Sequence, residues 1–341
     1  MNLHDPPDAF PENPARLLAV ERVLRQSGLW GTCENVCVDT AISRDEITAV
    51  YGERVVEKMS ANIVRVANKG PFHSGDIYWT ANTMTASAIA ANAAIQATES
   101  VLAKGGSAFA LIRPPGHHCF NVPAGFCILN NVVFATRAAQ KAGKRVAILD
   151  WDYHFGDGTA EAVKTMDDVM FVSLHCMRDR RGSATYPHSK LKGGQLAKET
   201  AGRCFNVAWH LDDADDAALA FALTRLILPA LERFAPDVLL ISAGYDALRG
   251  DDLAGMELTP AVFRAATSAL RTLGLPLVAV LEGGYNVDLL AEGVAETVYG
   301  MLETPSRTEI EALSVAVLGH HRVLVETVAE HNRMCARASS S

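Results

Sequence analysis

Five short runs of apolar residues alternate with longer, helix-like segments along this chain. The apolar runs cover residues 108–112, 146–149, 169–172, 238–241 and 277–281. Their apolarity is continuous rather than alternating, which is typical of strands that are buried on both faces of a sheet. Helical patterns lie beside them at residues 83–102, 131–142, 216–234 and 259–273. This order predicts an α/β fold built on a parallel sheet with right-handed crossovers.

The same alternation favours one domain over two. The length alone gives a prior of about two domains, but no linker, repeat or change of composition interrupts the pattern. Local signals place helix ends, since Thr259 and Pro260 suit the start of a helix and Gly274 suits its end. We therefore expect a single α/β domain over residues 1–341.

Charge and cysteine content limit the binding partners and the cellular compartment that we expect for the protein. The net charge of −8 argues against direct nucleic-acid binding. Seven scattered cysteines indicate a reducing compartment rather than a disulfide-stabilised fold. The first 14 residues lack the pattern of a signal peptide, and no apolar run reaches the roughly 18 residues of a membrane span. We expect a cytoplasmic or nuclear protein without a membrane partner.

Chemically reactive side chains follow each of the apolar runs. The clusters cover residues 113–118, 150–154, 173–175, 242–246 and 282–285. Each is placed at the carboxyl end of a predicted strand, and this edge is where ligands bind in open parallel sheets. We therefore expect the clusters to converge on one crevice.

A metal site is the first chemistry that these clusters suggest. Asp152 and His154 stand two positions apart, so in an extended segment their side chains point to the same side. Asp246, beyond another strand, is the natural third ligand, which leaves a fourth position open. Mixed nitrogen and oxygen ligands suit Zn2+, with Fe2+ as a competitor. The alternative interpretation is that these residues only cap turns.

Two further motifs suggest acid–base chemistry. The adjacent histidines His117 and His118 have Asp150 and Asp157 as candidate carboxylate partners. Such pairs orient catalytic imidazoles. Tyr285 follows two glycines and either marks a tight turn or donates a hydrogen bond to a developing oxyanion. Other histidines without an identifiable partner are interpreted as structural: His175, His188, His210, His320 and His321.

Taken together, the motifs resemble the zinc-dependent histone deacetylase family of the arginase/deacetylase superfamily. The matching segments are residues 113–118, 125–127, 150–159, 173–175, 244–247 and 282–285. The likeness runs from about residue 4 to about residue 302 and is strongest to the class II branch and its bacterial relatives. It implies one catalytic domain, with a parallel sheet of about eight strands flanked by helices. A C-terminal helical segment and tail would follow at residues 303–341.

The resemblance also implies catalytic roles. His118, paired with Asp157, would be the general base for water and the general acid for the leaving amine. His117, paired with Asp150, would assist electrostatically. Tyr285 would stabilise the tetrahedral oxyanion, and its presence where a histidine would weaken activity favours a working deacetylase.

The resemblance also implies which residues bind the metal ions and the substrate. The zinc ligands would be Asp152, His154 and Asp246. The acyl-lysine tunnel would be lined by Gly125, Phe126, Tyr186, Gly283 and Gly284. A structural K+ would be held, partly through main-chain oxygens, by Asp150, Asp152, His154, Ser173 and Leu174. Arg16 would match an arginine of the inner exit channel.

The chain departs from the family pattern at several positions. Phe155 stands where a second histidine usually follows the zinc-binding one, and Tyr153 replaces a common aliphatic residue. Neither belongs to the implied ligand set, so we expect metal binding to survive. The loop at residues 119–124 is shorter than usual and the loop at residues 176–185 is longer. Asp76 is the candidate for the aspartate that holds the substrate backbone at the rim in many members.

The expected activity is hydrolysis of N-acetyl-lysine or other N-acyl-lysine amides in proteins such as histones. The same machinery would also serve an amidohydrolase acting on acetylpolyamines or other small molecules. A third interpretation, from another functional class, is an acyl-lysine-binding module with little turnover. A binuclear manganese hydrolase of the arginase type is less favoured, because residues 244–247 supply only one aspartate. Acyl chain length and oligomeric state are not indicated by the sequence.

Overall fold

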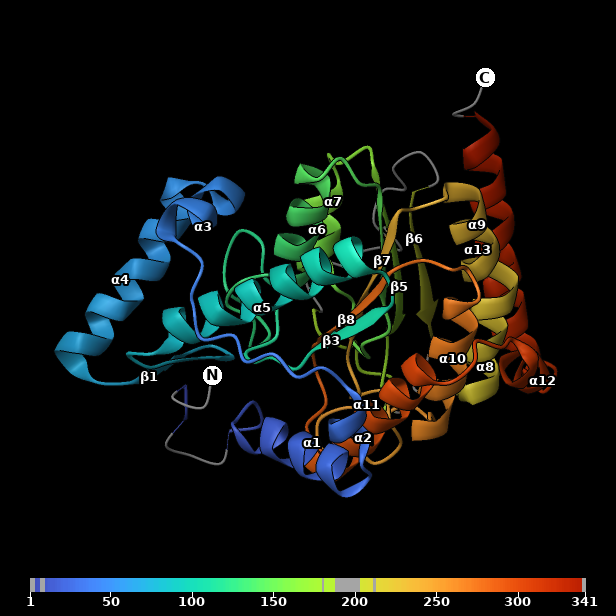
Figure 1. The fold of residues 1–341 in the computed structure, drawn as a ribbon, viewed down its shortest axis with the longest axis horizontal. Coiled ribbons are helices and arrows are strands. Elements are labelled where there is room, and N and C mark those ends of the chain that lie inside the picture. The colour runs from blue at the N-terminus through green and yellow to red at the C-terminus, as the bar shows by residue number, and fades with distance from the viewer. Residues whose placement is uncertain (1–3, 7–9, 180, 188–202, 211–212, 339–341) are drawn as a thin grey trace.

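A computed structural model describes residues 4–6, 10–179, 181–187, 203–210 and 213–338 of the chain (Figure 1). His188, which the sequence analysis interprets as structural, lies outside these residues. No helix among them is both long and apolar enough to cross a membrane.

A six-stranded parallel sheet forms the centre of the molecule. Its strand order is β3-β8-β7-β4-β5-β6. The bounds are Ser107–Ala110 for β3, Val146–Asp150 for β4, Val169–Cys176 for β5, Cys204–Trp209 for β6, Val238–Ala243 for β7 and Leu277–Leu281 for β8. All five predicted runs are strands of this sheet, and their parallel pairing is confirmed. The sixth strand, β6, was not predicted because Asn206 interrupts its apolar run, although all of its residues are buried.

Within the described ranges the parallel sheet has six strands rather than the expected number of about eight. Two further strands, β1 (Phe72–Ser74) and β2 (Ile77–Trp79), form a separate antiparallel hairpin. The hairpin turns at Gly75, whose φ of +64° suits glycine. Each of its strands has only three residues, and the pair is not hydrogen-bonded to the central sheet.

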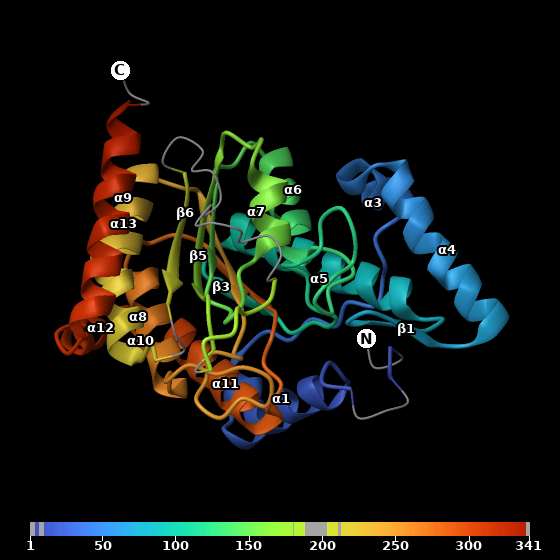
Figure 2. The same cartoon turned by 180° about the vertical axis from the view of Figure 1, so that it is seen from behind.

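Helices cover both faces of the sheet, as Figures 1 and 2 show from opposite sides. On one side lie α5 (Thr83–Lys104), α6 (Asn131–Lys141) and α7 (Asp157–Val163). On the other lie α8 (Asp216–Ala222), α9 (Leu228–Phe234), α10 (Pro260–Arg271) and α13 (Gly319–Ala338). The remaining helices are α1 (Ala15–Gln26), α2 (Leu29–Thr32), α3 (Arg44–Tyr51), α4 (Glu53–Lys69), α11 (Val287–Leu302) and α12 (Thr308–Ser314). This arrangement confirms the α/β class.

The helices predicted from the sequence are present, with local differences. The segment 216–234 is interrupted by a π-helical turn, η2 (Leu223–Ile227), just before Pro229. Proline has no N–H to donate to a regular helical hydrogen bond, which accounts for a change of register at this point. Thr259 stands at the N-cap of α10 as predicted, but its hydroxyl donates to Asp216 Oδ2 at 2.6 Å instead of capping its own helix.

Candidate active site

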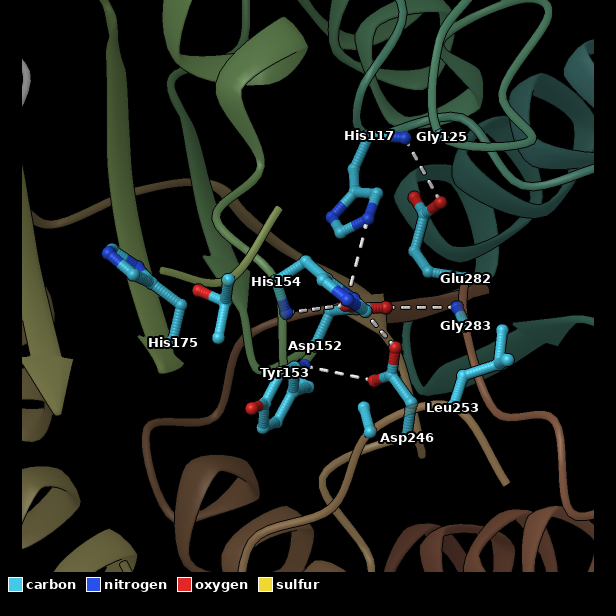
Figure 3. Close-up of polar contacts among 12 residues, drawn as sticks. His117, Gly125, Asp152, Tyr153, His154, His175, Asp246, Leu253, Glu282 and Gly283 are labelled. Atoms are coloured by element: carbon cyan, nitrogen blue, oxygen red, sulfur yellow. Dashed lines mark hydrogen bonds and ion pairs between the residues drawn. The ribbon is translucent and has the colours of Figure 1, made fainter. Parts of the chain in front are cut away.

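The loops that follow β3, β4, β7 and β8 meet at the carboxyl edge of the sheet, where Figure 3 shows their side chains converging. His117 comes from the first loop, Asp152 and His154 from the second, and Asp246 from the third. Residues 173–175 were expected to follow a strand, but β5 continues to Cys176, so they lie within it. The predicted meeting of these clusters at one edge of the sheet is therefore present for four of the five, while residues 173–175 belong to β5 itself.

The two carboxylates and the imidazole predicted as ligands lie together. His154 Nδ1 is 2.9 Å from Asp246 Oδ2 and 3.2 Å from Asp152 Oδ1. One candidate ligand atom from each of the three residues lies within 4.8 Å of the others. Backbone donors fix the carboxylates, since Tyr153 N donates to Asp246 at 2.9 Å and Gly283 N donates to Asp152 at 2.9 Å. Backbone hydrogen bonds thus help to hold the ligand atoms together.

The buried negative charges of the two carboxylates favour a bound cation. Asp152 and Asp246 are fully buried, and among the described residues their ion pairs are with histidines rather than with lysine or arginine. Burial, followed by the charge of Asp152, raises the pKa of Asp246 from 3.8 to about 6. Buried carboxylates in this situation are normally paired or bind metal. The donor set, one imidazole and two carboxylates, fits Zn2+.

Glycines allow the backbone to approach these carboxylates closely. A Cβ atom at Gly283 would lie 2.5 Å from Asp246 Oδ2 and 2.7 Å from Asp152 Oδ2. A Cβ atom at Gly244 would lie 2.1 Å from Asp152 Oδ2. All three separations are shorter than nonbonded contacts allow, so Gly244 and Gly283 are needed for close packing of the ligand cradle.

The two adjacent histidines each face a carboxylate, as predicted. His117 Nδ1 is 3.0 Å from Asp150 Oδ2, and His118 Nδ1 is 2.8 Å from Asp157 Oδ1. Burial, followed by the charge of His117, lowers the pKa of His118 from 6.5 to about 3. For His117 burial acts in the same direction, but the carboxylates of Asp152 and Asp150 outweigh it and raise its pKa well above 6.5. Burial thus favours the neutral form of His118, and the carboxylates favour the protonated form of His117.

Glu282 has a part in this site that the sequence analysis did not assign. Its Oε2 accepts hydrogen bonds from Gly116 N at 2.7 Å and from His117 N at 3.1 Å. Its Oε1 accepts one from Ser242 Oγ at 3.2 Å. Glu282 is fully buried, and burial raises its pKa to about 7. The available signal was a glutamate directly after a strand of continuous apolarity, where an unpaired carboxylate would be costly.

Tyr285 lies in the turn between β8 and α11. Its backbone N–H donates to Asp251 Oδ2 at 2.7 Å, which fixes the turn from a neighbouring loop. Burial raises the pKa of Tyr285 well above 10, and the opposing charge of Arg16 offsets this only in part. The hydroxyl therefore remains a hydrogen-bond donor at neutral pH. Asp251 was not singled out in the sequence.

Arg16 supports the same turn from the N-terminal helix α1. Its side chain is fully buried, and it donates to the carbonyl oxygens of Gly284 at 2.7 Å and Glu282 at 2.5 Å. The guanidinium carbon lies 5.2 Å from the ring centroid of Tyr285. Arg16 therefore holds the backbone on either side of Gly283. Its place in an exit channel stays a prediction.

Two of the residues predicted for the tunnel, Gly125 and Tyr186, lie next to His118, and a third, Phe126, lies next to Tyr285. The ring of Tyr186 meets His118 edge-on at a centroid distance of 4.8 Å, and the ring of Phe126 meets Tyr285 at 5.4 Å. Asp76 Oδ2 accepts a hydrogen bond from Gly125 N at 2.9 Å. Burial, followed by the charge of Asp76, raises the pKa of Tyr186 above 10. Asp76 thus braces the loop that carries Gly125 and Phe126.

Substitution of Gly125 by alanine is expected to lower turnover. A Cβ atom here would lie 2.4 Å from His118 Cδ2, and the φ of +53° disfavours alanine. Because a misplacement of about 1 Å costs on the order of a hundredfold in rate, we expect Gly125→Ala to lose at least about tenfold in kcat while keeping its zinc. Gly143→Ala is the control, with a φ of +72° and no atom within 4 Å. Equal kcat values for the two variants would show that His118 tolerates this displacement.

The residues implied for potassium are adjacent across two strands. Asp150 on β4 is the register partner of Ser173 on β5, and both are fully buried. Ser173 Oγ lies 2.9 Å from His175 Nδ1. The nearby Phe155, which departs from the family pattern, packs its ring against His175 at a centroid distance of 4.7 Å. Phe155 therefore serves the core rather than the ligand set.

Comparisons with known proteins agree with this geometry. The model of the histone deacetylase domain matches residues 10–301. The solved structure described as the HDA15 HD domain is similar, with a TM-score of 0.78 and 28% identity over 98% of this chain and 94% of that chain.

Three curated relatives are similar in sequence. Histone deacetylase 6 of Caenorhabditis elegans is 34% identical over 88% of this chain, and histone deacetylase 15 of Arabidopsis thaliana is 32% identical over 92%. The human polyamine deacetylase HDAC10 is 33% identical over 89%. The chain spans 32%, 57% and 46% of the lengths of these three proteins, respectively.

Proposed function

The chain belongs to the histone deacetylase family, and on that premise we propose that it hydrolyses N-acetyl-lysine or related N-acyl-lysine amides of proteins such as histones. The observation that carries the proposal is the meeting of three candidate metal ligands with a carboxylate-paired histidine and a protonated tyrosine at one edge of the sheet. This combination suits attack of water on an amide carbonyl.

Zinc is the proposed metal, with Asp152, His154 and Asp246 as its ligands. When bound, Zn2+ supplies Lewis acidity that polarises the amide carbonyl and lowers the pKa of water. The buried carboxylates, which have no lysine or arginine partner among the described residues, support this assignment. Fe2+ has the same ligand preferences and is the competing ion.

His118 moves the proton in the proposed reaction. Its Nδ1 is held by Asp157 at 2.8 Å, which leaves Nε2 free to accept a proton from the attacking water. The water oxygen forms a bond to the carbonyl carbon. His118 then gives the proton to the amide nitrogen, the carbon–nitrogen bond breaks, and acetic acid, which keeps the second proton of the water, and the neutral lysine amine leave. Its lowered pKa keeps it unprotonated before each cycle.

Two groups stabilise the negative charge that develops on the carbonyl oxygen. Tyr285 donates a hydrogen bond from a hydroxyl that burial keeps protonated. His117, which lies 3.0 Å from Asp150 and 3.7 Å from Asp152, provides positive charge in its protonated form, which these carboxylates favour. Both groups are positioned before the reaction, so little reorganisation is needed as charge develops.

A structural potassium ion is also proposed, at Asp150, Asp152, His154, Ser173 and Leu174. The carboxylate, hydroxyl and main-chain oxygens there are the ligands that hard cations prefer. Support comes from the pairing of Asp150 with Ser173 across β4 and β5, both without exposure to solvent. The ion would join two strands directly behind the zinc ligands.

A second candidate function is deacetylation of polyamines, which the similarity to a relative named polyamine deacetylase HDAC10 favours. The two substrates are separated by kcat/KM values of the zinc-loaded protein on acetyl-lysine peptides and on acetylspermidine. We expect the peptide to be preferred by about tenfold or more, a ratio that pocket contacts readily supply. The reverse preference would assign the chain to polyamines, and peptide binding without turnover would make it a binding module.

Cytoplasmic or nuclear location remains a prediction.

A further inference from the structure

Three side chains with metal-binding atoms gather at the start of the C-terminal helix α13. His320 and His321 are the second and third residues of this helix, and Asp213 lies between β6 and α8. His320 Nε2 is 3.1 Å from Asp213 Oδ2, and His321 Nε2 is 3.6 Å from Asp213 Oδ1. One ligand atom from each residue lies within 4.8 Å of the others. The sequence analysis found no partner for these histidines, and the structure supplies one.

His321 gives independent evidence that something is bound here. The residue is only 1% exposed, and its Nε2 has no hydrogen-bond partner among the described residues although it points toward Asp213. The ring is fixed by edge-on contact with Trp209, at a centroid distance of 5.2 Å. A hydrogen bond between His320 and Asp213 leaves this nitrogen unsatisfied. A cation between the three side chains satisfies all of them together.

The observed separations suit zinc. Ligand atoms at roughly 2.0–2.1 Å from a tetrahedral zinc ion are roughly 3.3 Å apart. Here His320 Nε2 lies 3.1 Å from Asp213 Oδ2 and His321 Nε2 lies 3.6 Å from Asp213 Oδ1, so each imidazole faces its own oxygen of the carboxylate. The exposed side chain of His320 is free to adjust by a small rotation. Two imidazoles and one carboxylate form a ligand set that zinc binds well, with positions left for water.

Acidic side chains close to this cluster favour a cation. Asp215, whose charge reaches His321, lines a shallow hollow of about 520 Å³. The hollow carries more acidic than basic side chains: Asp215, Asp216, Glu257 and Glu309 against Arg249.

We propose that Asp213, His320 and His321 form a second zinc site, which fastens the start of α13 to the segment between β6 and α8. Figure 1 shows α13 running along the outer side of the molecule beside α9, with its first turns near α8 and α12. The helix packs on β6, at the edge of the sheet. A bound ion cross-links two segments that are 107 residues apart in sequence.

This site is independent of the proposed catalytic one. His320 and His321 lie beyond residues 10–301, the part that the family model matches. No residue is shared with the cradle of Asp152, His154 and Asp246. The arginase-type alternative also needs a second ion, but there the ion would share the cradle, so the effect of His320 on metal content separates the two cases.

The test is the number of zinc ions bound per chain by the full-length protein. Metal-free samples are dialysed against low-micromolar zinc and analysed by mass spectrometry of the metal. The variants are His320→Ala and Asp213→Asn, both exposed enough to leave the core intact. The matched control is Glu326→Gln, which removes an exposed carboxylate from the same helix. His321 is left in place because it packs against Trp209.

We expect both variants to bind one ion fewer than the wild type and Glu326→Gln to bind the same number. Added zinc should raise the Tm of the wild type further than that of His320→Ala, with deacetylation by His320→Ala unchanged. The proposal is overturned if both variants bind as many ions as the wild type with equal affinity. Because the comparison is a difference from wild type, it stands even if the catalytic ligand set or the proposed substrate is wrong.

Discussion

Asp246→Asn is expected to lose its zinc and, with it, all turnover above background. The substitution keeps the shape of the side chain and an oxygen that accepts the hydrogen bond from Tyr153 N, so the loop stays folded. What it removes is the negative charge of a ligand in a fully buried cradle. Mutation of a residue that only supports a metal ligand typically weakens metal affinity by about tenfold to a hundredfold. We expect the loss for Asp246→Asn to exceed about a hundredfold for that reason.

The measurement is zinc content after dialysis, together with kcat on an acetyl-lysine peptide. Asp252→Asn is the matched control, since it removes an exposed carboxylate from the same loop and should keep both zinc and activity. The ion lost in Asp246→Asn must be distinct from the ion lost in His320→Ala, so the double variant should bind neither. A fully zinc-loaded and active Asp246→Asn protein would disprove the ligand set.

The central sheet could be predicted because its strands obey a simple rule. Strands covered on both faces have no polar side, so continuous apolarity revealed five of the six. The exception, β6, contains Asn206, whose side-chain oxygen is buried without a hydrogen-bond partner among the described residues. This single amide broke the run of apolar residues by which the other strands were recognised. The sequence around Asn206 does not show that the folded protein buries it.

The main site residues could also be predicted, because parallel strands bring their carboxyl ends to one edge. Residues that act through the backbone of distant loops could not. Glu282 reaches the N–H of His117 across 165 positions, and Asp251 reaches the N–H of Tyr285 across 34. Neither residue type nor spacing reveals such contacts. The pairing of His320 with Asp213 is hidden for the same reason.

Tyr285→Phe is expected to lower kcat by on the order of a hundredfold or more, with zinc content unchanged. Removing one oxyanion donor costs about 2.7–4 kcal/mol in barrier in other enzymes. The ring contact with Phe126 and the backbone hydrogen bond to Asp251 do not involve the hydroxyl, so both survive in the variant. The loss is therefore confined to the developing oxyanion.

The division of this loss between kcat and KM tests the role of Tyr285. A hydrogen bond that forms only as the oxyanion develops lowers kcat and kcat/KM together and leaves KM nearly constant. A hydroxyl that merely binds the substrate carbonyl would raise KM instead. Tyr299→Phe is the control, a half-buried tyrosine on α11 outside the catalytic machinery. Near-normal kcat in Tyr285→Phe would show that the oxyanion is stabilised elsewhere, with the cationic His117 as the remaining charge beside His118.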